Sequence, residues 1–282
     1  MTLEAWLAKA EARLRAGPHP DRARRDAETL LLHVIRSERA ALIVRWKEVL
    51  DEAESARYLE LIGRRQAGEP IQYILGETEF YGLPFHVSRD VLIPRPETEH
   101  LVEKVIEIAE QLHAPRIVDV GAGSGCIAVA LAAKVPHALI TATDLAPPTL
   151  AIARQNAERN AVAGRIRFLK GNRLAPVAGE QFEIVVSNPP YVPTADRASL
   201  AAEVRDHEPP LALFAGAGGL DVYRALIPEA FAALVPGGYL ALEIGYGQSE
   251  PVGALLSAAG FAEIELTPDL QGIPRVVIAR RR

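Results

Sequence analysis

Strand-like and helix-like segments alternate along the chain from about residue 94 onward. The expected strands, short runs rich in aliphatic and β-branched residues, are residues 116–120, 139–143, 166–169, 182–187 and 239–244. The expected helices, with apolar residues at helical spacing, are residues 124–134, 148–158, 221–234 and 249–259. Strands that alternate with helices need crossover connections, so the pattern predicts a mainly parallel sheet with helices on both faces.

Two more strands are expected near the C-terminus, over residues 262–266 and 275–279. The link between them, residues 268–273, is too short for a helical crossover, so the two strands should pair antiparallel at one edge. The expected fold class is therefore α/β, with a mainly parallel, Rossmann-like sheet and an antiparallel C-terminal edge pair.

The first 93 residues have a different organisation. Apolar residues recur at helical spacing over residues 3–14 and 23–35, and a third helical pattern ends near Gly68. These patterns predict a small helical bundle over residues 1–70. Short alternating runs with Gly76, Gly82 and Pro84 predict a β-hairpin linker over residues 71–93. The α/β domain is then expected over residues 94–282.

Composition excludes several classes of protein. A chain of 282 residues with 49% apolar residues can bury a substantial core, and no uncharged apolar run approaches the roughly 20 residues that span a bilayer. A single cysteine excludes a disulfide framework, and the seven histidines show no metal-ligand spacing. We therefore expect a reduced, cytoplasmic protein with no metal site and no membrane partner. The net charge of −5 argues against a protein whose affinity rests on nucleic-acid phosphates.

A glycine-rich turn follows the expected strand over residues 116–120 and opens the next helix. Its sequence is Gly121-Ala122-Gly123-Ser124-Gly125. Glycines let the backbone approach a ligand, and the N-terminus of a helix offers free N–H groups to an anion. Asp144 ends the next expected strand, 23 residues after Gly121, where its carboxylate can accept both hydroxyls of a ribose. Together these residues predict a binding site for an adenosine-containing cofactor.

The residue at position 126 indicates which cofactor. A dinucleotide-binding turn has a small residue, glycine or alanine, three positions after its second glycine, but Cys126 stands there and the third glycine comes one residue earlier. This shift favours S-adenosylmethionine and argues against a nicotinamide dehydrogenase.

The sequence Asn188-Pro189-Pro190-Tyr191 follows the expected strand over residues 182–187, where open α/β sheets bind ligands. A planar amide or aromatic amine is a poor nucleophile, because its lone pair is delocalised. The Asn188 side-chain oxygen and the Pro189 carbonyl could accept its two N–H groups and hold it in line with a methyl donor. Pro190 stiffens the turn, and Tyr191 could stack on the acceptor. Asn188, Pro189 and Tyr191 are thus expected to be catalytic, all four residues to bind substrate, and Asn188 also to contact the cofactor.

Motifs over nearly the whole chain after residue 65 resemble those of bacterial peptide chain release factor glutamine methyltransferases, the HemK/PrmC family. Besides the glycine turn and Asn188-Pro189-Pro190-Tyr191, they are Glu69-Pro70-Ile71-Gln72-Tyr73-Ile74, Leu92-Ile93-Pro94-Arg95-Pro96-Glu97-Thr98-Glu99, Glu208-Pro209 and Leu242-Glu243-Ile244-Gly245. The resemblance implies a class I methyltransferase that methylates the side-chain amide nitrogen (N5) of the glutamine in the Gly-Gly-Gln motif of class 1 release factors. It also implies that the glycine turn and Asp144 bind S-adenosylmethionine, that residues 188–191 bind the glutamine, and that residues 1–70 help to dock the release factor. Direct binding of nucleic acid is not expected.

One position departs from the family pattern. Asn172 stands where the family usually has an aspartate that accepts from the adenine amine. Its amide oxygen can still accept, so Asn172 is expected to bind the cofactor. The stem of Arg173 either lines the adenine pocket or is exposed to solvent.

Two other functions remain open at this point. Asn-Pro-Pro-Tyr also occurs in adenine-N6 methyltransferases, so the protein could be a nucleic-acid adenine-N6 methyltransferase. It could also be a binding module that holds an adenosine ligand without catalysis. Methyl transfer to nucleic acid would favour the first, and cofactor binding without turnover the second.

Overall fold

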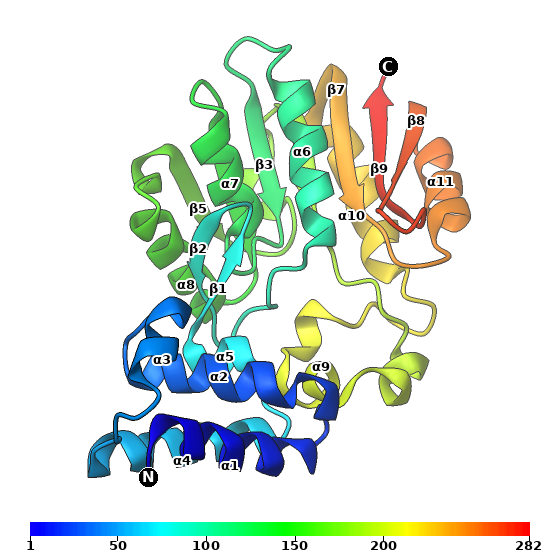
Figure 1. Cartoon of the computed structure of the whole chain (residues 1–282). Helices are drawn as coiled ribbons and strands as arrows, with labels where there is room; N and C mark the ends of the chain where they lie inside the picture. Colours follow the sequence, from blue (N-terminus) through cyan, green and yellow to red (C-terminus); the bar gives the residue numbers. More distant parts are fainter. The chain divides into compact units, whose positions relative to one another are not determined.

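The computed structural model describes residues 1–282, apart from the side chains of residues 41 and 43. The chain forms two compact units, which are coloured along the sequence in Figure 1. Met1–Gly76 and Leu200–His207 form the N-terminal unit, while Glu77–Ser199 and Glu208–Arg282 form the α/β unit. Among the described residues, no helix combines the length and apolar character required to cross a membrane.

The N-terminal unit is helical. Its helices are α1 (Leu3–Arg15), α2 (Ala23–Val34), α3 (Arg39–Arg45), α4 (Glu52–Gln66), α5 (Ile71–Leu75) and α9 (Ala202–His207). Local signals begin two of them: the Thr2 hydroxyl accepts from the N–H of Ala5 at the start of α1, and Asp51 and Glu54 form a capping box at the start of α4. Apolar residues from α1, α2 and α4, including Leu7, pack into one core.

A buried arginine joins α9 to this unit. The guanidinium of Arg65 is 2% exposed and donates to Asp26 Oδ2 at 2.6 Å and to Glu203 Oε2 at 3.2 Å. It also donates to the carbonyl of Glu69 at 3.0 Å. A buried charge has to be paired, so these contacts tie Glu203 and its helix to α2 and α4. The segment Leu200–His207 therefore belongs to the helical unit, although it lies far along the sequence.

The β-hairpin begins later than the sequence analysis expected. Residues 71–75, expected to start the linker, form α5, whose Ile74 is part of the helical core. Gly76 ends this helix in a left-handed conformation, with φ of 77°. The hairpin itself consists of β1 (Glu77–Phe80) and β2 (Leu83–His86), paired antiparallel.

The α/β unit is built on a seven-stranded sheet. Its strands are β3 (Arg116–Val120), β4 (Leu139–Asp144), β5 (Ile166–Lys170), β6 (Phe182–Ser187), β7 (Leu234–Glu243), β8 (Phe261–Pro268) and β9 (Pro274–Arg281). The strand order is β5-β4-β3-β6-β7-β9-β8, in which the first five strands are parallel and β9 runs antiparallel to both of its neighbours (Figure 1). The predicted fold class is confirmed, including the antiparallel pair at the C-terminal edge.

Both faces of the sheet are covered by helices. The helices of this unit are α6 (Glu97–Ala109), α7 (Cys126–Lys134), α8 (Pro147–Arg159), α10 (Asp221–Ala233) and α11 (Ser249–Ala258). Successive strand residues enter opposite cores: Ile117 packs with α6 and α7, whereas Val118 packs with α10 and α11. Phe80 and Phe85 place the hairpin on the α6–α7 face. This two-sided burial explains why the strands read as nearly continuous apolar runs.

Candidate active site

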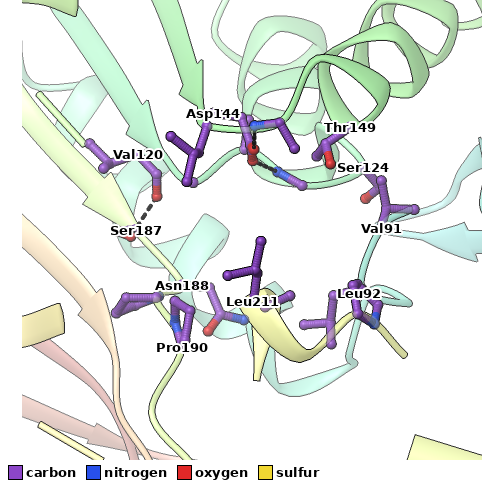
Figure 2. Close-up of a pocket in the computed structure, with 18 of the residues that line it drawn as sticks. Val91, Leu92, Val120, Ser124, Asp144, Thr149, Ser187, Asn188, Pro190 and Leu211 are labelled. Atoms are coloured by element: carbon purple, nitrogen blue, oxygen red, sulfur yellow. Dashed lines mark hydrogen bonds between the residues drawn. The ribbon is translucent and has the colours of Figure 1, made fainter. Parts of the chain in front are cut away.

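A cavity of about 510 Å³ opens at the carboxyl ends of β3, β4 and β6, within the α/β unit. Strand order reverses between β3 and β6, and ligands bind at such a position in open α/β sheets. In Figure 2, Asp144 and Ser124 lie on one side of the opening and Asn188 and Pro190 on the other. Most of the predicted site residues line this cavity: Gly121, Ala122, Gly123, Ser124, Asp144, Asn172, Arg173, Asn188, Pro189 and Pro190.

The glycine turn gives its glycines different roles. Gly121 has φ of 77°, and a Cβ built on it would meet no atom within 4 Å, so the cavity reaches its Cα. Gly125 has φ of 81°, but a Cβ there would lie 3.1 Å from the Cβ of Ala153. Gly125 is absent from the cavity lining, because it faces α8. Although it was expected to bind the cofactor, its position gives it a packing role.

Three backbone N–H groups of the glycine turn donate hydrogen bonds to other residues of the protein. The N–H groups of Gly121 and Ala122 both donate to the carbonyl of Thr143, and that of Gly123 donates to Asp144 Oδ2 at 3.0 Å. From the sequence, such N–H groups were expected to face an anionic group of the ligand. Instead, these three hold β3 and β4 together, so the turn offers the ligand room rather than donors at these positions.

Asp144 is fixed by two backbone donors. Its Oδ2 accepts from Gly123 and its Oδ1 accepts from the N–H of Ala146, each at 3.0 Å (Figure 2). An ionised carboxylate has about four acceptor sites, so two remain for the hydroxyls of a ligand. The carboxylate therefore has the position and the capacity expected for a ribose-binding residue.

Asp119 is a buried carboxyl group beneath the turn that the sequence analysis did not single out. Its Oδ2 accepts from the N–H of Ala128 at 3.2 Å, whereas its Oδ1 has no hydrogen-bond partner among the described residues. Burial raises the pKa of Asp119 to about 7, and the nearby charge of Asp144 acts in the same direction. A carboxyl group within the otherwise apolar end of β3, between Val118 and Val120, was the feature of the sequence that could have pointed to this residue.

Asn172 and Arg173 lie together on the cavity wall. Asn172 Oδ1 accepts from Arg173 Nη1 at 3.2 Å, which leaves one acceptor site on that oxygen. The Arg173 guanidinium also pairs with Glu229 of α10 at 2.7 Å. Arg173 therefore lines the cavity and forms an ion pair. Of the two alternatives for its side chain, this agrees with the one that lines the pocket and not with the one that is exposed to solvent.

The amide of Asn188 is held from the side of α6. Its Nδ2 donates to the Thr98 hydroxyl at 3.0 Å, and that hydroxyl donates to Glu243 Oε2 at 2.6 Å. Thr98 is 1% exposed and Glu243 is 2% exposed. Burial raises the pKa of Glu243 to about 7, even though hydrogen bonds from Thr98 and Tyr191 oppose the shift. Glu243 was noted only as part of a family motif, and no local pattern linked it or Thr98 to Asn188.

Tyr191 does not line the cavity. Its hydroxyl donates to Glu243 Oε1 at 3.3 Å, and its carbonyl accepts from Gln248 Nε2 at 3.0 Å. Burial raises the pKa of the Tyr191 hydroxyl well above its ordinary value. The expected stacking of this ring on the acceptor therefore has no support in the structure, which places Tyr191 behind Asn188 as a support for the turn.

The cavity wall opposite the glycine turn is largely apolar. Leu211, in the short 3₁₀ turn Pro210–Ala212, is 76% exposed and points into the opening (Figure 2). Leu92 lines the same cavity. Beside them Arg95 donates to the buried Glu208 at 2.6 Å. This wall can take a flat or aliphatic group next to the polar site of Asn188.

The residues present fit an adenosyl cofactor. Gly121 leaves open space above its Cα, and Asp144 keeps free acceptor sites beside it. The unpartnered oxygen of Asp119 adds a buried acceptor next to the turn. The open space and the free acceptor sites suit a polar ligand with ribose hydroxyls.

Solved structures and family models agree with this fold. A methyltransferase from Pyrococcus furiosus matches with a TM-score of 0.52 and 19% identity, over 72% of this chain and 90% of that one. The T. Thermophilus 16S rRNA methyltransferase RsmC, in complex with AdoMet and guanosine, matches with a TM-score of 0.54 and 20% identity, over 73% and 50% of the chains. Residues 5–76 match the model of the PrmC N-terminal domain, and residues 97–204 match that of the methyltransferase small domain. Fold and site define an S-adenosylmethionine-dependent methyltransferase.

Relatives identify the family. The release factor glutamine methyltransferase of Deinococcus radiodurans is 44% identical over 283 residues, covering 100% of this chain and 99% of that protein. The protein of the same name from Geobacter sulfurreducens is 43% identical over 260 residues, covering 92% and 90%. The chain belongs to the release factor glutamine methyltransferase family.

Proposed function

We propose that this protein methylates the side-chain amide nitrogen of the glutamine in the Gly-Gly-Gln motif of class 1 peptide chain release factors. The observation that carries the proposal is that Asn188 and the glycine turn line one cavity, with the Asn188 amide anchored through its nitrogen. An amide held by its Nδ2 turns its Oδ1 away from the anchor, which leaves an acceptor for an N–H of the substrate.

The cofactor would be held on the side of β3 and β4. Asp144 would accept the ribose hydroxyls, Gly121 and Gly123 would let the backbone approach, and Asn172 would accept from the adenine amine. Bound there, S-adenosylmethionine supplies a methyl group activated by a positively charged sulfur. The remaining task of the chain is to hold the acceptor nitrogen in position.

The substrate amide would be held on the side of β6. Asn188 Oδ1 and the Pro189 carbonyl would accept its two N–H groups, which localises the lone pair on the nitrogen and aims it at the methyl group. Such orientation can supply up to about 7–11 kcal/mol of a barrier. Once methylated, the nitrogen is cationic and loses a proton readily, so no strong general base is needed.

The N-terminal unit would dock the release factor. This role is supported by the course of the chain: Leu200–His207 belongs to that unit, yet it joins the substrate turn at residues 188–191 to the cavity wall at Leu211. A release factor as substrate places the reaction in the cytoplasm, where translation terminates.

Transfer of label tests this function. The protein is mixed with methyl-labelled S-adenosylmethionine and either an unmodified release factor or a version with Gln→Ala in the Gly-Gly-Gln motif, with tRNA and DNA in parallel reactions. We expect label on the unmodified factor alone. Equal label on both factors would refute the site of modification, and label on nucleic acid would support the adenine-N6 alternative instead.

A further inference from the structure

The side-chain amide of Asn188 can bind an acceptor –NH₂ group in only one of its two orientations. With Oδ1 toward the acceptor it receives an N–H, whereas a half-turn of the amide presents Nδ2 and brings two N–H groups against each other. The amide group is nearly symmetric in shape, so packing alone distinguishes these orientations poorly. Its hydrogen bonds must select between them.

Thr98 provides that selection through the single proton of its hydroxyl. An ionised carboxylate can only accept, and Thr98 Oγ1 lies 2.6 Å from Glu243 Oε2, so the hydroxyl proton is directed to Glu243. Oγ1 then has only lone pairs to offer Asn188. At 3.0 Å it can bond Nδ2 but would repel Oδ1. Among the described residues, Asn188 makes its side-chain hydrogen bonds through Nδ2 alone.

The carboxylate of Glu243 accepts a second hydrogen bond. Tyr191 donates to its other oxygen at 3.3 Å, and the Tyr223 hydroxyl fixes the backbone of the same residue by donating to its carbonyl at 2.8 Å. When Glu243 is ionised, the four groups thus form a directed chain of hydrogen bonds: Tyr191 and Thr98 donate to Glu243, and Asn188 donates to Thr98. Reversing the last link would require Thr98 to give up its bond to a buried carboxylate.

We infer that Thr98 and Glu243 are positioning residues that fix the orientation of the Asn188 amide, so that Oδ1 faces the nitrogen to be methylated. The inference rests on the proposed function, because it assumes that Asn188 accepts from the substrate amide. It goes further in assigning an orienting role to two buried residues that act through Asn188, of which Thr98 lies on the lining of the same cavity and Glu243 lies behind it.

Thr98→Val tests the inference, because valine keeps the shape of threonine and removes the hydroxyl. We expect kcat for release factor methylation to fall about tenfold or more, while the affinity for S-adenosylmethionine by calorimetry stays within about twofold. Thr98→Ser, which restores the hydroxyl, should bring kcat back to within about threefold of the unchanged protein. Thr141→Val is the matched control: Thr141 is also buried, but its hydroxyl bonds Arg167 outside the cavity, and this variant should keep its kcat.

A second variant addresses the carboxylate in case Thr98→Val folds poorly. Glu243→Gln keeps the shape but can donate as well as accept, so Thr98 no longer has to send its proton that way, and kcat should fall severalfold. Normal kcat in both Thr98→Val and Glu243→Gln would overturn the inference, as would a Thr98→Ser variant as impaired as Thr98→Val. Failure of the unchanged protein to methylate the glutamine would instead refute the proposed function.

Discussion

The hydroxyl of Tyr191 lies 3.3 Å from Oε1 of Glu243 and turns the tyrosine away from the cavity that its neighbour Asn188 lines. The same carboxylate accepts from Thr98, which accepts from Asn188. Residues 188 and 191 of one turn are therefore tied to a single buried acid at the end of β7. The turn at the end of β6 derives its shape from this acid as well as from its two prolines.

Tyr191→Phe should disturb this support without removing an aromatic surface. The buried carboxylate of Glu243 loses one of its donors, so we expect the free energy of unfolding to fall by about 1 kcal/mol. Methylation should slow only severalfold, because Thr98 still anchors Asn188. Urea unfolding and steady-state kinetics measure the two effects. A loss of activity as large as that of Asn188→Ala would show that the Tyr191 hydroxyl acts on the substrate itself.

Alanine should affect different properties at the two glycines: mainly the stability of the fold at Gly125 and mainly the affinity for the cofactor at Gly121. At Gly125 the new Cβ meets Ala153 at 3.1 Å with φ of 81°, so Gly125→Ala should destabilise the fold by about 1–3 kcal/mol. Gly121 has a similar φ of 77° but open space above it, so Gly121→Ala should reduce cofactor affinity more than it reduces stability. Urea unfolding without cofactor and calorimetry with S-adenosylmethionine separate the two. Equal losses of affinity at both positions would contradict the packing role of Gly125.

Asn172→Asp should leave the affinity for S-adenosylmethionine equal or make it tighter. A charged acceptor replaces a neutral one, which is worth about 1 kcal/mol, and the guanidinium of Arg173 at 3.2 Å would stabilise the new carboxylate. Calorimetry on the folded protein measures the change, with Asn172→Ala as the control that removes the acceptor. Markedly weaker binding of the Asp variant would argue against an adenine amine at this position.

The stability of the protein should depend on pH through Glu243. Its pKa is raised from 4.5 to about 7, so the folded protein holds this proton more tightly than the unfolded chain. The resulting contribution is fully present below about pH 4.5 and is lost as the pH rises through about 7. Glu243→Gln removes this dependence, so its free energy of unfolding should fall less than that of the unchanged protein between about pH 5 and pH 8. Asp119 has a pKa raised in the same direction and is present in both proteins, so it cancels in the comparison.

If the free energy of unfolding varied with pH in the same way in the unchanged protein and in Glu243→Gln, Glu243 would be ionised throughout the range. The groups that act on it come from several elements: Thr98 and Glu97 of α6, Tyr191 of the turn, Arg275 of β9 and Tyr223 of α10. Arg275 favours the charged form and Glu97 the neutral form, while burial has the largest effect.

Catalysis should depend on the same proton. A protonated Glu243 can donate to Thr98, which frees the Thr98 hydroxyl proton to face Asn188 and makes the reversed amide acceptable. We therefore expect kcat to rise as the pH increases through about 7 in the unchanged protein and to be lower and flatter in Glu243→Gln. Rate measurements at saturating substrates show this directly. A rise that persists unchanged in Glu243→Gln would belong to another group.

Most of the sheet could be predicted from the sequence, because parallel strands buried on both faces are apolar runs and the helices between them have their own period. The early start of the predicted hairpin was wrong, because the apolar pattern of residues 71–75 suits a short helix as well as a strand. That α9 belongs to the helical unit could not be predicted, because it depends on the pairing of Arg65 with Glu203, 138 residues away.

The site was predictable in its motifs but less so in its contacts. Residues 121–124 of the glycine turn, Asp144 and Asn188 line one cavity as expected, since the carboxyl ends of parallel strands meet at one edge. The roles within each motif were harder to assign, because spacing does not show that Gly125 faces α8 or that Tyr191 turns inward. Thr98 lies 90 residues from Asn188 and 145 from Glu243 in sequence, and no local signal joins them.

The most direct test of the whole account is the mass of the Gly-Gly-Gln peptide in release factors from cells with the gene, without it, and with the Asn188→Ala form alone. We predict one added methyl group on the glutamine in the first case and none in the second. The Asn188→Ala protein should leave most of the peptide unmodified while it still binds S-adenosylmethionine, because removal of one hydrogen-bonding group that acts in the transition state can slow catalysis by about 10²–10³-fold. A fully methylated glutamine in cells that lack the gene, or in cells with Asn188→Ala alone, would contradict the account.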